Sequence, residues 1–372
     1  MKFLIVTHVP HITAQNRFFA YAPYVNEMNI WIENVDELSI LAPKSVETLS
    51  AIDTCYVHDR IQFIPVANFD FLNSKNSFLA VTKFPKICWK MFKAMQQADH
   101  IHLRCPGNIG LLGCFVQILF PNKTKTAKYA GNWDPKSAQP WTYKLQSWLL
   151  NNRFLTRKMT VLVYGEWQNL SANSKPFFTA TYREAEKIEI QKRTFKGAIK
   201  FLFVGTLVQG KNPLYAIQLV EQLLSKGVSA TLELYGEGVE RHMLEDYIVK
   251  NKLENSITLK GNQNREILQQ AYQNTHFVLL PSDSEGWPKA IAEGMFWGAV
   301  PIATAISCVP YMLDHGQRGI LIEKNLDKDV VAICDHINNV QKYHTVSAKA
   351  WAWSQQFTMD RFEIEIKKFL QS

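Results

Sequence analysis

Residues 277–294 have the sequence FVLLPSDSEGWPKAIAEG. This stretch combines the pattern of a buried strand, a polar turn and the first residues of a helix. The run Phe277–Leu280 is apolar throughout, which is typical of a strand inside a parallel sheet. Pro288 favours the first turn of a helix. Glu285 then falls in the turn, whereas Glu293 falls in an apolar helix, where a carboxylate needs a hydrogen-bonding partner. The stretch predicts a βα unit with carboxylates near the end of its strand.

The same alternation of apolar runs and helix-length segments continues along the whole chain. Because such alternation is typical of parallel sheets, we expect an α/β protein with two Rossmann-like domains, and 372 residues suit two domains. We expect a first domain over 1–183, a charged linker over 184–200, a second domain over 201–350 and a terminal helix over 351–372. The expected strands are 2–7, 39–42, 61–65, 100–103, 126–129, 160–163, 201–204, 230–235, 256–260, 277–280 and 300–303.

Composition narrows the class of protein. The longest apolar run, 109–120, is shorter than the roughly 20 residues that cross a bilayer, and the N-terminus lacks the apolar core of a secretory signal. The six cysteines are scattered without a C-x-x-C pair, as in a reduced protein. We therefore expect a cytoplasmic location.

Positive charge is concentrated in the first half of the chain. Residues 1–196 hold 24 Lys and Arg against 14 Asp and Glu, whereas residues 197–372 hold 17 against 19. Four lysines, Lys83, Lys86, Lys90 and Lys93, share one face of an expected helix over 83–97. Two interpretations stay open: a solvated surface that aids solubility, or a peripheral contact with phosphate or with the cytoplasmic face of a membrane.

A second strand-to-helix turn lies in residues 203–217, FVGTLVQGKNPLYAI. Asn212 is a suitable N-cap and Pro213 a suitable first helical residue, which places Lys211 at a helix N-terminus. Turns of this kind lie at the carboxyl edge of a parallel sheet, where ligands bind. Lys211 and the helix N-terminus would together hold a diphosphate. The alternative is an ordinary surface lysine.

Four segments together, 203–217, LELYGEG at 232–238, 277–304 and RGILIE at 318–323, resemble the donor-binding half of retaining glycosyltransferases of family four, also called group 1. The most specific part is the pair of glutamates eight positions apart in SEGWPKAIAEG. The resemblance implies the GT-B fold, with two domains facing across a cleft and a terminal helix that crosses back to the first domain. It implies hexosyltransferase-type transfer from a UDP- or GDP-linked sugar, with retention, onto a glycan or lipid-linked acceptor in surface polysaccharide biosynthesis.

The resemblance also implies roles for single residues. Lys211 matches the lysine that binds the donor diphosphate, Glu285 the glutamate that contacts the transferred sugar, and Glu293 the glutamate that binds the ribose. Glu285 and Lys211 are the expected catalytic residues. The expected donor site consists of Gly205, Thr206, Lys211, Glu285, Gly286, Trp287, Pro288, Lys289 and Glu293.

Thr206 departs from the family pattern, which has an arginine at this position. The missing charge weakens the diphosphate site by about 1.5–3 kcal/mol unless Lys289 or Arg183 replaces it. This departure leaves a catalytically impaired sugar-nucleotide-binding protein as an alternative function. A nucleotide-sugar epimerase of the same fold is a third, less favoured by the glutamate motif.

The first domain carries the expected acceptor side. Its first strand is followed by His8-Val9-Pro10-His11, where the family commonly has a glycine-rich loop. The acceptor-side candidates are His8, His11, Asn132, Trp133 and Asp134, with ordinary loop histidines as the alternative for the first two.

The resemblance also implies a mechanism that requires no protein nucleophile, in which the departing diphosphate itself accepts the proton of the acceptor. Asp283-Ser284-Glu285 only superficially resembles a metal-binding D-x-D motif, so we expect no metal and no cofactor. The Gly236-Glu237-Gly238 run begins like a dinucleotide fingerprint, but Arg241 occupies the place of its third glycine, which argues against NAD. We expect no nucleic-acid partner.

Overall fold

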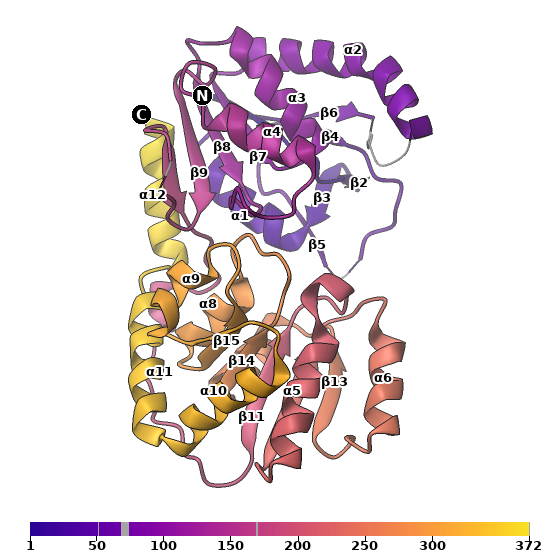
Figure 1. The fold of residues 1–372 in the computed structure, drawn as a ribbon. Helices are drawn as coiled ribbons and strands as arrows, with labels where there is room; N and C mark the ends of the chain where they lie inside the picture. The colour runs from indigo at the N-terminus through magenta and orange to yellow at the C-terminus, as the bar shows by residue number, and fades with distance from the viewer. Residues whose placement is uncertain (51, 68–73, 169, 372) are drawn as a thin grey trace. The chain divides into compact units, whose positions relative to one another are not determined.

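The computed structural model describes residues 1–50, 52–67, 74–168 and 170–371. The chain divides into two compact units, one made of residues 1–177 with 362–372 and the other of residues 178–361 (Figure 1). Each unit is built around a parallel sheet with helices, so the predicted α/β class is confirmed. No helix in the described ranges is long and apolar enough to cross a membrane.

The first unit contains a seven-stranded parallel sheet in the order β10-β9-β8-β7-β1-β4-β6. The strand order reverses between β1 and β7, so the loops that follow these two strands lie at the switch point where α/β sheets bind ligands. The six strands expected here are present within a few residues of their predicted bounds. The strands are β1 (Lys2–Val6), β4 (Glu37–Pro43), β6 (Ile61–Val66), β7 (His100–Cys105), β8 (Thr124–Tyr129), β9 (Met159–Tyr164) and β10 (Ser174–Phe177).

A small antiparallel sheet in the first unit was not expected from the sequence. It contains β2 (Ile12–Ala14), β3 (Arg17–Tyr21) and β5 (Asp53–Cys55). Gln15 and Asn16 join the first two strands with φ angles of 48° and 57°. Two successive left-handed residues make the tight turn that suits a hairpin, but Gln-Asn lacks the glycine that usually marks such a turn.

Four helices belong to the chain between the strands of the first unit: α1 (Ala22–Ile32), α2 (Ser74–Gln97), α3 (Asn108–Val116) and α4 (Trp141–Leu150). The short η1 (Gln117–Leu119) continues α3. Apolar residues of β1, β7, β8 and β9 pack against α2, α3 and α4 in one core that includes Leu4, Leu103 and Val161. This core holds the ends of the strands, and therefore the loops that follow them, in fixed positions.

The second unit contains a six-stranded parallel sheet in the order β13-β12-β11-β14-β15-β16. The order reverses between β11 and β14, which are the strands that precede the two turns singled out in the sequence. The strands are β11 (Ile199–Val204), β12 (Ala230–Tyr235), β13 (Ile257–Gly261), β14 (Phe277–Leu280), β15 (Val300–Thr304) and β16 (Ile320–Ile322). The helices are α5 (Pro213–Ser225), α6 (Arg241–Lys250), α7 (Arg265–Asn274), α8 (Lys289–Phe296), α9 (Val309–Met312), α10 (Leu326–Asn338) and α11 (Val340–Ser354).

The segment expected as a linker, 184–200, lies in the second unit in this structure. The guanidinium of Arg193 donates hydrogen bonds to the backbone carbonyls of Tyr272, Gln273, Trp297 and Gly298. These bonds connect the segment to the C-terminal ends of α7 and α8. The charged segment therefore lies along the surface of the second unit. The chain passes from one unit to the other at 177–178 and at 361–362.

The expected single helix over 351–372 is two helices. α11 ends at Ser354 and α12 runs from Met359 to Gln371. Between them, the buried Thr358 accepts a hydrogen bond from the backbone N–H of Arg361, which begins the new helix. From Phe362 onward α12 belongs to the first unit, where Phe369 packs against Phe177 and Trp31. The predicted contact of a C-terminal helix with the first domain is therefore confirmed.

Candidate functional site

Two turns at the switch point of the second unit are joined to each other. The side-chain amide of Asn212, after β11, donates to the carbonyl of Pro281, after β14, at 2.9 Å. The N–H of Asp283 donates to the carbonyl of Gly210, also at 2.9 Å. Asn212 has a φ of 51° and no side-chain bond to its own helix, so it connects the two turns and does not cap α5 as predicted.

The joined turns bring Lys211 and Glu285 into direct contact. The Nζ of Lys211 donates to Oε1 of Glu285 at 2.5 Å. The lysine side chain is 29% exposed, whereas the glutamate side chain is 8% exposed. The two residues to which the sequence assigned catalytic roles, 74 positions apart, thus form one ion pair in the free protein. The glutamate is enclosed by the protein, and the lysine is the partner that solvent or a ligand can reach.

Two glycines after β12 support the turn after β11 by close backbone contact. A Cβ on Gly236 would lie 2.0 Å from the carbonyl oxygen of Gly205, and a Cβ on Gly238 would lie 2.2 Å from that of Leu207. The N–H of Leu207 donates to the carbonyl of Glu237 at 2.9 Å. Sequence reasoning gave these glycines no role. Their spacing was the available signal, because glycine permits backbones to approach where a side chain would clash.

The turn after β14 directs the side chains of its own residues to different places. Pro288 is the N-cap residue, so α8 begins at Lys289, one residue after the predicted start. The ring of Trp287 is buried and stacks on Trp353 at 6.1 Å between centroids. The backbone of Trp287 stays in the turn, but its indole stabilises the packing of α11. The carbonyl of Gly286 accepts a hydrogen bond from the thiol of Cys308 at 3.0 Å.

Glu293, the expected ribose ligand, lies one helix turn further along α8. Its Oε1 accepts a hydrogen bond from the hydroxyl of Thr181 at 2.7 Å. Burial raises the pKa of its carboxyl, and the Thr181 bond together with the charge of Lys289 opposes this rise. The structure thus supplies the hydroxyl partner that an apolar helix environment demands, and a pair of ribose hydroxyls would compete for the same carboxylate.

The raised pKa of Glu293 leads to a testable prediction about the stability of the fold. Because the folded state binds this proton more tightly than the unfolded state, ionisation of the carboxyl opposes folding. This cost is absent below the ordinary pKa of 4.5 and grows as the pH rises through the folded pKa. Glu293→Gln is therefore expected to raise the melting temperature at neutral pH and to leave it nearly unchanged near pH 4.5.

Melting curves of Glu293→Gln and of the wild type across this pH range test the prediction. Glu254→Gln, at an exposed glutamate of the same unit, is the matched control and is expected to change little at any pH. An equal gain for Glu293→Gln at both ends of the range would show that the carboxyl does not resist ionisation.

Thr206 and the two cations proposed to compensate for it lie in different surroundings. Thr206 is exposed at the turn after β11, and Lys289 is half-buried at the start of α8, where its charge acts on Glu293. Arg183, the other proposed substitute cation, forms an ion pair with Asp360 at 3.5 Å. Of the two substitutes, Lys289 lies on the helix that carries Glu293, whereas Arg183 is engaged at the start of α12.

At the carboxyl edge of the first unit, one buried carboxylate holds two cations. Oε1 of Glu27, on α1, accepts from Nη1 of Arg104 at 2.6 Å, and Oε2 accepts from Nζ of Lys128 at 2.9 Å. All three side chains are at most 10% exposed. The Lys128 ammonium also lies 5.1 Å from the ring centroid of Phe362 in α12. Sequence reasoning missed this cluster, although a lysine inside a strand of buried type was a signal, because a buried charge requires a partner.

The acceptor-side candidates differ in what they present to solvent. His8 keeps an exposed surface, but its ring packs beside Gly107, so desolvation and then the charge of Arg104 lower its pKa. His11 is fully buried, bonds through its ring nitrogens to the carbonyl of Val9 and the hydroxyl of Tyr56, and has a pKa lowered to about 4 by burial. A structural role therefore fits His11 better than contact with an acceptor.

The loop after β8 holds the other three acceptor-side candidates. The ring of Trp133 is buried edge-on against Tyr129 at 4.9 Å between centroids, so it does not offer the flat face expected for a sugar. Oδ1 of Asn132 accepts from the N–H of Asp134 at 2.9 Å and shapes the turn. Asp134 keeps partial exposure. His8 and Asp134 are thus the candidates that remain accessible.

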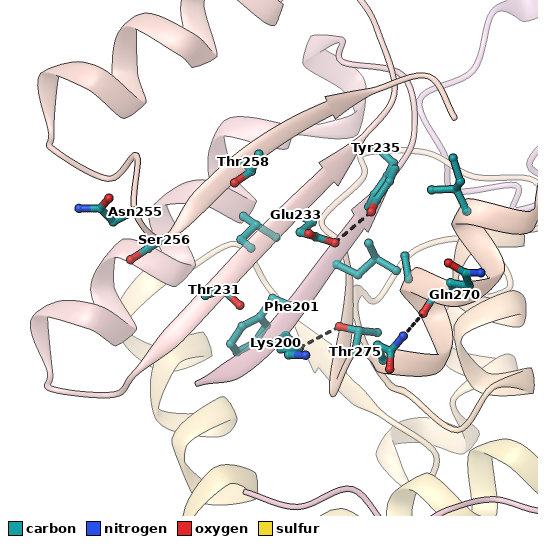
Figure 2. Close-up of a pocket in the computed structure, with 15 residues that line it drawn as sticks. Lys200, Phe201, Thr231, Glu233, Tyr235, Asn255, Ser256, Thr258, Gln270 and Thr275 are labelled. Atoms are coloured by element: carbon teal, nitrogen blue, oxygen red, sulfur yellow. Dashed lines mark hydrogen bonds between the residues drawn. The ribbon is translucent and has the colours of Figure 1, made fainter. Parts of the chain in front are cut away.

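A separate pocket of about 430 Å³ lies on the second unit, between α7 and the strands β11, β12 and β13 (Figure 2). In Figure 2 the hydroxyl of Tyr235 points to Glu233, and the two are 3.0 Å apart. The lining includes Lys200 and Thr231, which lie near the amino ends of their strands. The pocket does not include Lys211 or Glu285, so it is distinct from the donor-side candidates.

Comparisons with known proteins agree with this arrangement. Residues 184–348 match the family described as Glycosyl transferases group 1. These residues belong to the group 1 glycosyltransferase family. The match covers both joined turns of the second unit, and the resemblance stated from the sequence is confirmed. The whole chain has the GT-B fold.

Two relatives show the extent of the sequence similarity. An uncharacterised glycosyltransferase of Methanocaldococcus jannaschii is 27% identical over 168 residues, which cover 45% of this chain and 46% of the relative. A putative colanic acid biosynthesis glycosyltransferase, WcaL, of Salmonella typhimurium is 27% identical over 34% of this chain and 33% of its own. The chain therefore matches about half or less of the length of these curated relatives.

The crystal structure of HepE from Anabaena in complex with UDP-glucose superposes with a TM-score of 0.69 and 15% identity. The superposition covers 100% of this chain and 99% of that chain. At this identity the likeness establishes the fold, and the group 1 match rests on residues 184–348.

Proposed function

We propose that this protein transfers a hexose from a nucleotide sugar, with retention of configuration, to a glycan or lipid-linked acceptor in the synthesis of a surface polysaccharide. The observation that carries the proposal is the Lys211–Glu285 pair at the switch point of a group 1 domain. In this proposal Lys211 binds the donor diphosphate and stabilises the charge that develops on it as the bond to the sugar breaks. Glu285 binds hydroxyls of the sugar in the same proposal.

We favour UDP as the nucleotide part of the donor. HepE, which shares the fold over the full length, has been crystallised with UDP-glucose, and GDP is the alternative. Glu293 would bind the two ribose hydroxyls through its carboxylate, which Thr181 already holds in place. The proposed reaction uses no metal; loss of activity with a chelator and its return with manganese would show otherwise.

The experiment that tests the function has two readouts on the same protein. Melting temperatures are measured with UDP, GDP and CMP sugars, because a ligand that binds only the folded state raises stability. Sugar release or transfer from the best donor is then followed in the presence of lipid-linked acceptors. We expect a rise with UDP sugars and measurable turnover; no response to any donor contradicts the proposal.

Thr206 favours a second candidate, a sugar-nucleotide-binding protein without turnover. The exposed threonine supplies no charge at the position where the family has arginine. A strong thermal response to a donor, with no hydrolysis and no transfer to any acceptor tested, would favour this candidate over the enzyme.

A further inference from the structure

The helices α2, α3 and α4 form one continuous layer of the first unit. α3 packs against both α2 and α4, and the rings of Phe92 on α2 and Phe120 after η1 lie 5.1 Å apart. Figure 1 shows these three helices close together in the first unit. We call this layer, made of residues 74–97, 108–123 and 141–158, the three-helix face.

The three-helix face carries positive charge without any compensating acid. Its three segments contain ten lysines and arginines and no aspartate or glutamate. None of its described lysine and arginine side chains forms an ion pair; the side chains of Lys75 and Lys83 lie outside the described part. The exposed cations are Lys86, Lys93, Lys144, Arg153, Arg157 and Lys158. Solubility needs charge of either sign, whereas a single sign over a whole layer indicates an anionic partner.

The same face exposes large apolar side chains. Trp89, Trp141 and Trp148 are 61%, 67% and 59% exposed, and they are the exposed tryptophans of the described chain. Trp141, Lys144 and Trp148 follow the spacing that places residues on one side of a helix. Phe154 and Leu119 are 73% and 65% exposed. Leaving so many large rings in water is unfavourable unless something covers them.

Cations and rings on this face are interleaved. The ammonium of Lys93 lies 5.0 Å from the ring centroid of Trp89, and the guanidinium of Arg157 lies 5.0 Å from that of Phe154. An interface between water and lipid suits such a mixture, because tryptophan resides at the level of the headgroups and lysine or arginine near an anionic surface is attracted to it.

We propose that the three-helix face docks onto a membrane surface that contains anionic lipid. Phosphate headgroups would neutralise the uncompensated cations, and the rings would enter the boundary between headgroups and acyl chains. Both components are required, since a soluble polyanion would satisfy the cations and leave the tryptophans and Leu119 in water. This proposal does not depend on the donor site, whose residues all lie in the second unit.

Sedimentation with vesicles tests the docking face in the full-length protein. Vesicles of phosphatidylcholine alone are compared with vesicles that also contain phosphatidylglycerol, at low and high salt. We expect strong binding to the anionic vesicles that salt weakens, and little binding to phosphatidylcholine alone. Heparin, a soluble polyanion, is the competitor and is expected to bind less tightly than the anionic vesicles.

Two variants separate the apolar part of the interaction from its charge. Trp141→Ser with Trp148→Ser is expected to lower binding to anionic vesicles about tenfold or more, and so is Lys144→Glu with Arg157→Glu. Met243→Ser with Val249→Ser, on α6 of the second unit, removes similarly exposed apolar groups and is expected to leave binding unchanged. The melting temperature of each variant confirms that it is folded.

The results that overturn the proposal are equally specific. Equal binding to both kinds of vesicle excludes recognition of anionic lipid. Binding that is unaffected by the tryptophan substitutions and that heparin abolishes indicates a site for a soluble polyanion. A loss in the α6 control equal to that in the tryptophan variant places the contact elsewhere.

Discussion

Replacing Glu285 with glutamine is expected to tighten the binding of UDP about tenfold and to slow sugar transfer about 100-fold. In the free protein Lys211 is held by Glu285 at 2.5 Å, so a diphosphate must share or displace this carboxylate. Glutamine removes the competing negative charge and leaves the ammonium available to the phosphates. It also removes the charged acceptor that would hold the sugar, so binding and turnover change in opposite directions.

Replacing Lys211 with methionine is expected to weaken the binding of UDP and also to slow sugar transfer. UDP loses its cation, and Glu285, which is 8% exposed, loses its partner. An unsatisfied buried group of this kind costs about 1–3 kcal/mol of folding free energy. The double variant, Lys211→Met with Glu285→Gln, is expected to regain most of that stability without regaining transfer, because a glutamine does not need a cation.

Titration calorimetry with UDP, turnover assays and unfolding in denaturant on the four proteins of this cycle provide the measurements. Tighter UDP binding in Glu285→Gln together with weaker binding in Lys211→Met supports a pair that opens for the donor. If both single variants weaken UDP binding to the same extent, Glu285 contacts the nucleotide itself and does not compete with it.

The sequence was sufficient for the α/β class and for most strands of the two parallel sheets, because these strands are short apolar runs with helix-length segments between them. The same features located the two turns of the second unit. In a parallel sheet, the end of each strand fixes where its turn lies, so Lys211 and Glu285 could be assigned to one edge of the sheet. Their direct contact could not be predicted, because it depends on Asn212 and Gly210 bonding to the neighbouring turn.

The sequence does not reveal the direction of a loop side chain that can point in either of two ways. Trp133 and His11 belong to loops at the expected edge, but both turn into the protein core. An aromatic residue in a loop can pack inward or face a ligand, and the sequence pattern is the same for both. For a related reason, the charge density of 184–200 does not reveal that Arg193 binds backbone carbonyls of its own unit.

In the first unit, replacing Glu27 with glutamine is expected to lower the free energy of unfolding strongly. Arg104 and Lys128 would keep their charges in a buried environment and would lose the carboxylate that both of them contact. Breaking a buried pair in this way costs about 3–5 kcal/mol, which is a large share of the roughly 5–15 kcal/mol that stabilises a typical domain. Denaturant unfolding of the variant measures the loss directly.

Two further variants show whether charge is the cause. Glu33→Gln, at the end of the same helix, removes an exposed pair with Lys367 at 3.7 Å and is expected to cost less than about 0.5 kcal/mol. Adding Lys128→Met to Glu27→Gln is expected to recover part of the lost stability, because methionine fills a similar volume without a charge and packs against the rings that now surround the ammonium. If the double variant is less stable than Glu27→Gln alone, the stabilising contribution of Lys128 comes from its contact with those rings, and its pairing with Glu27 is secondary.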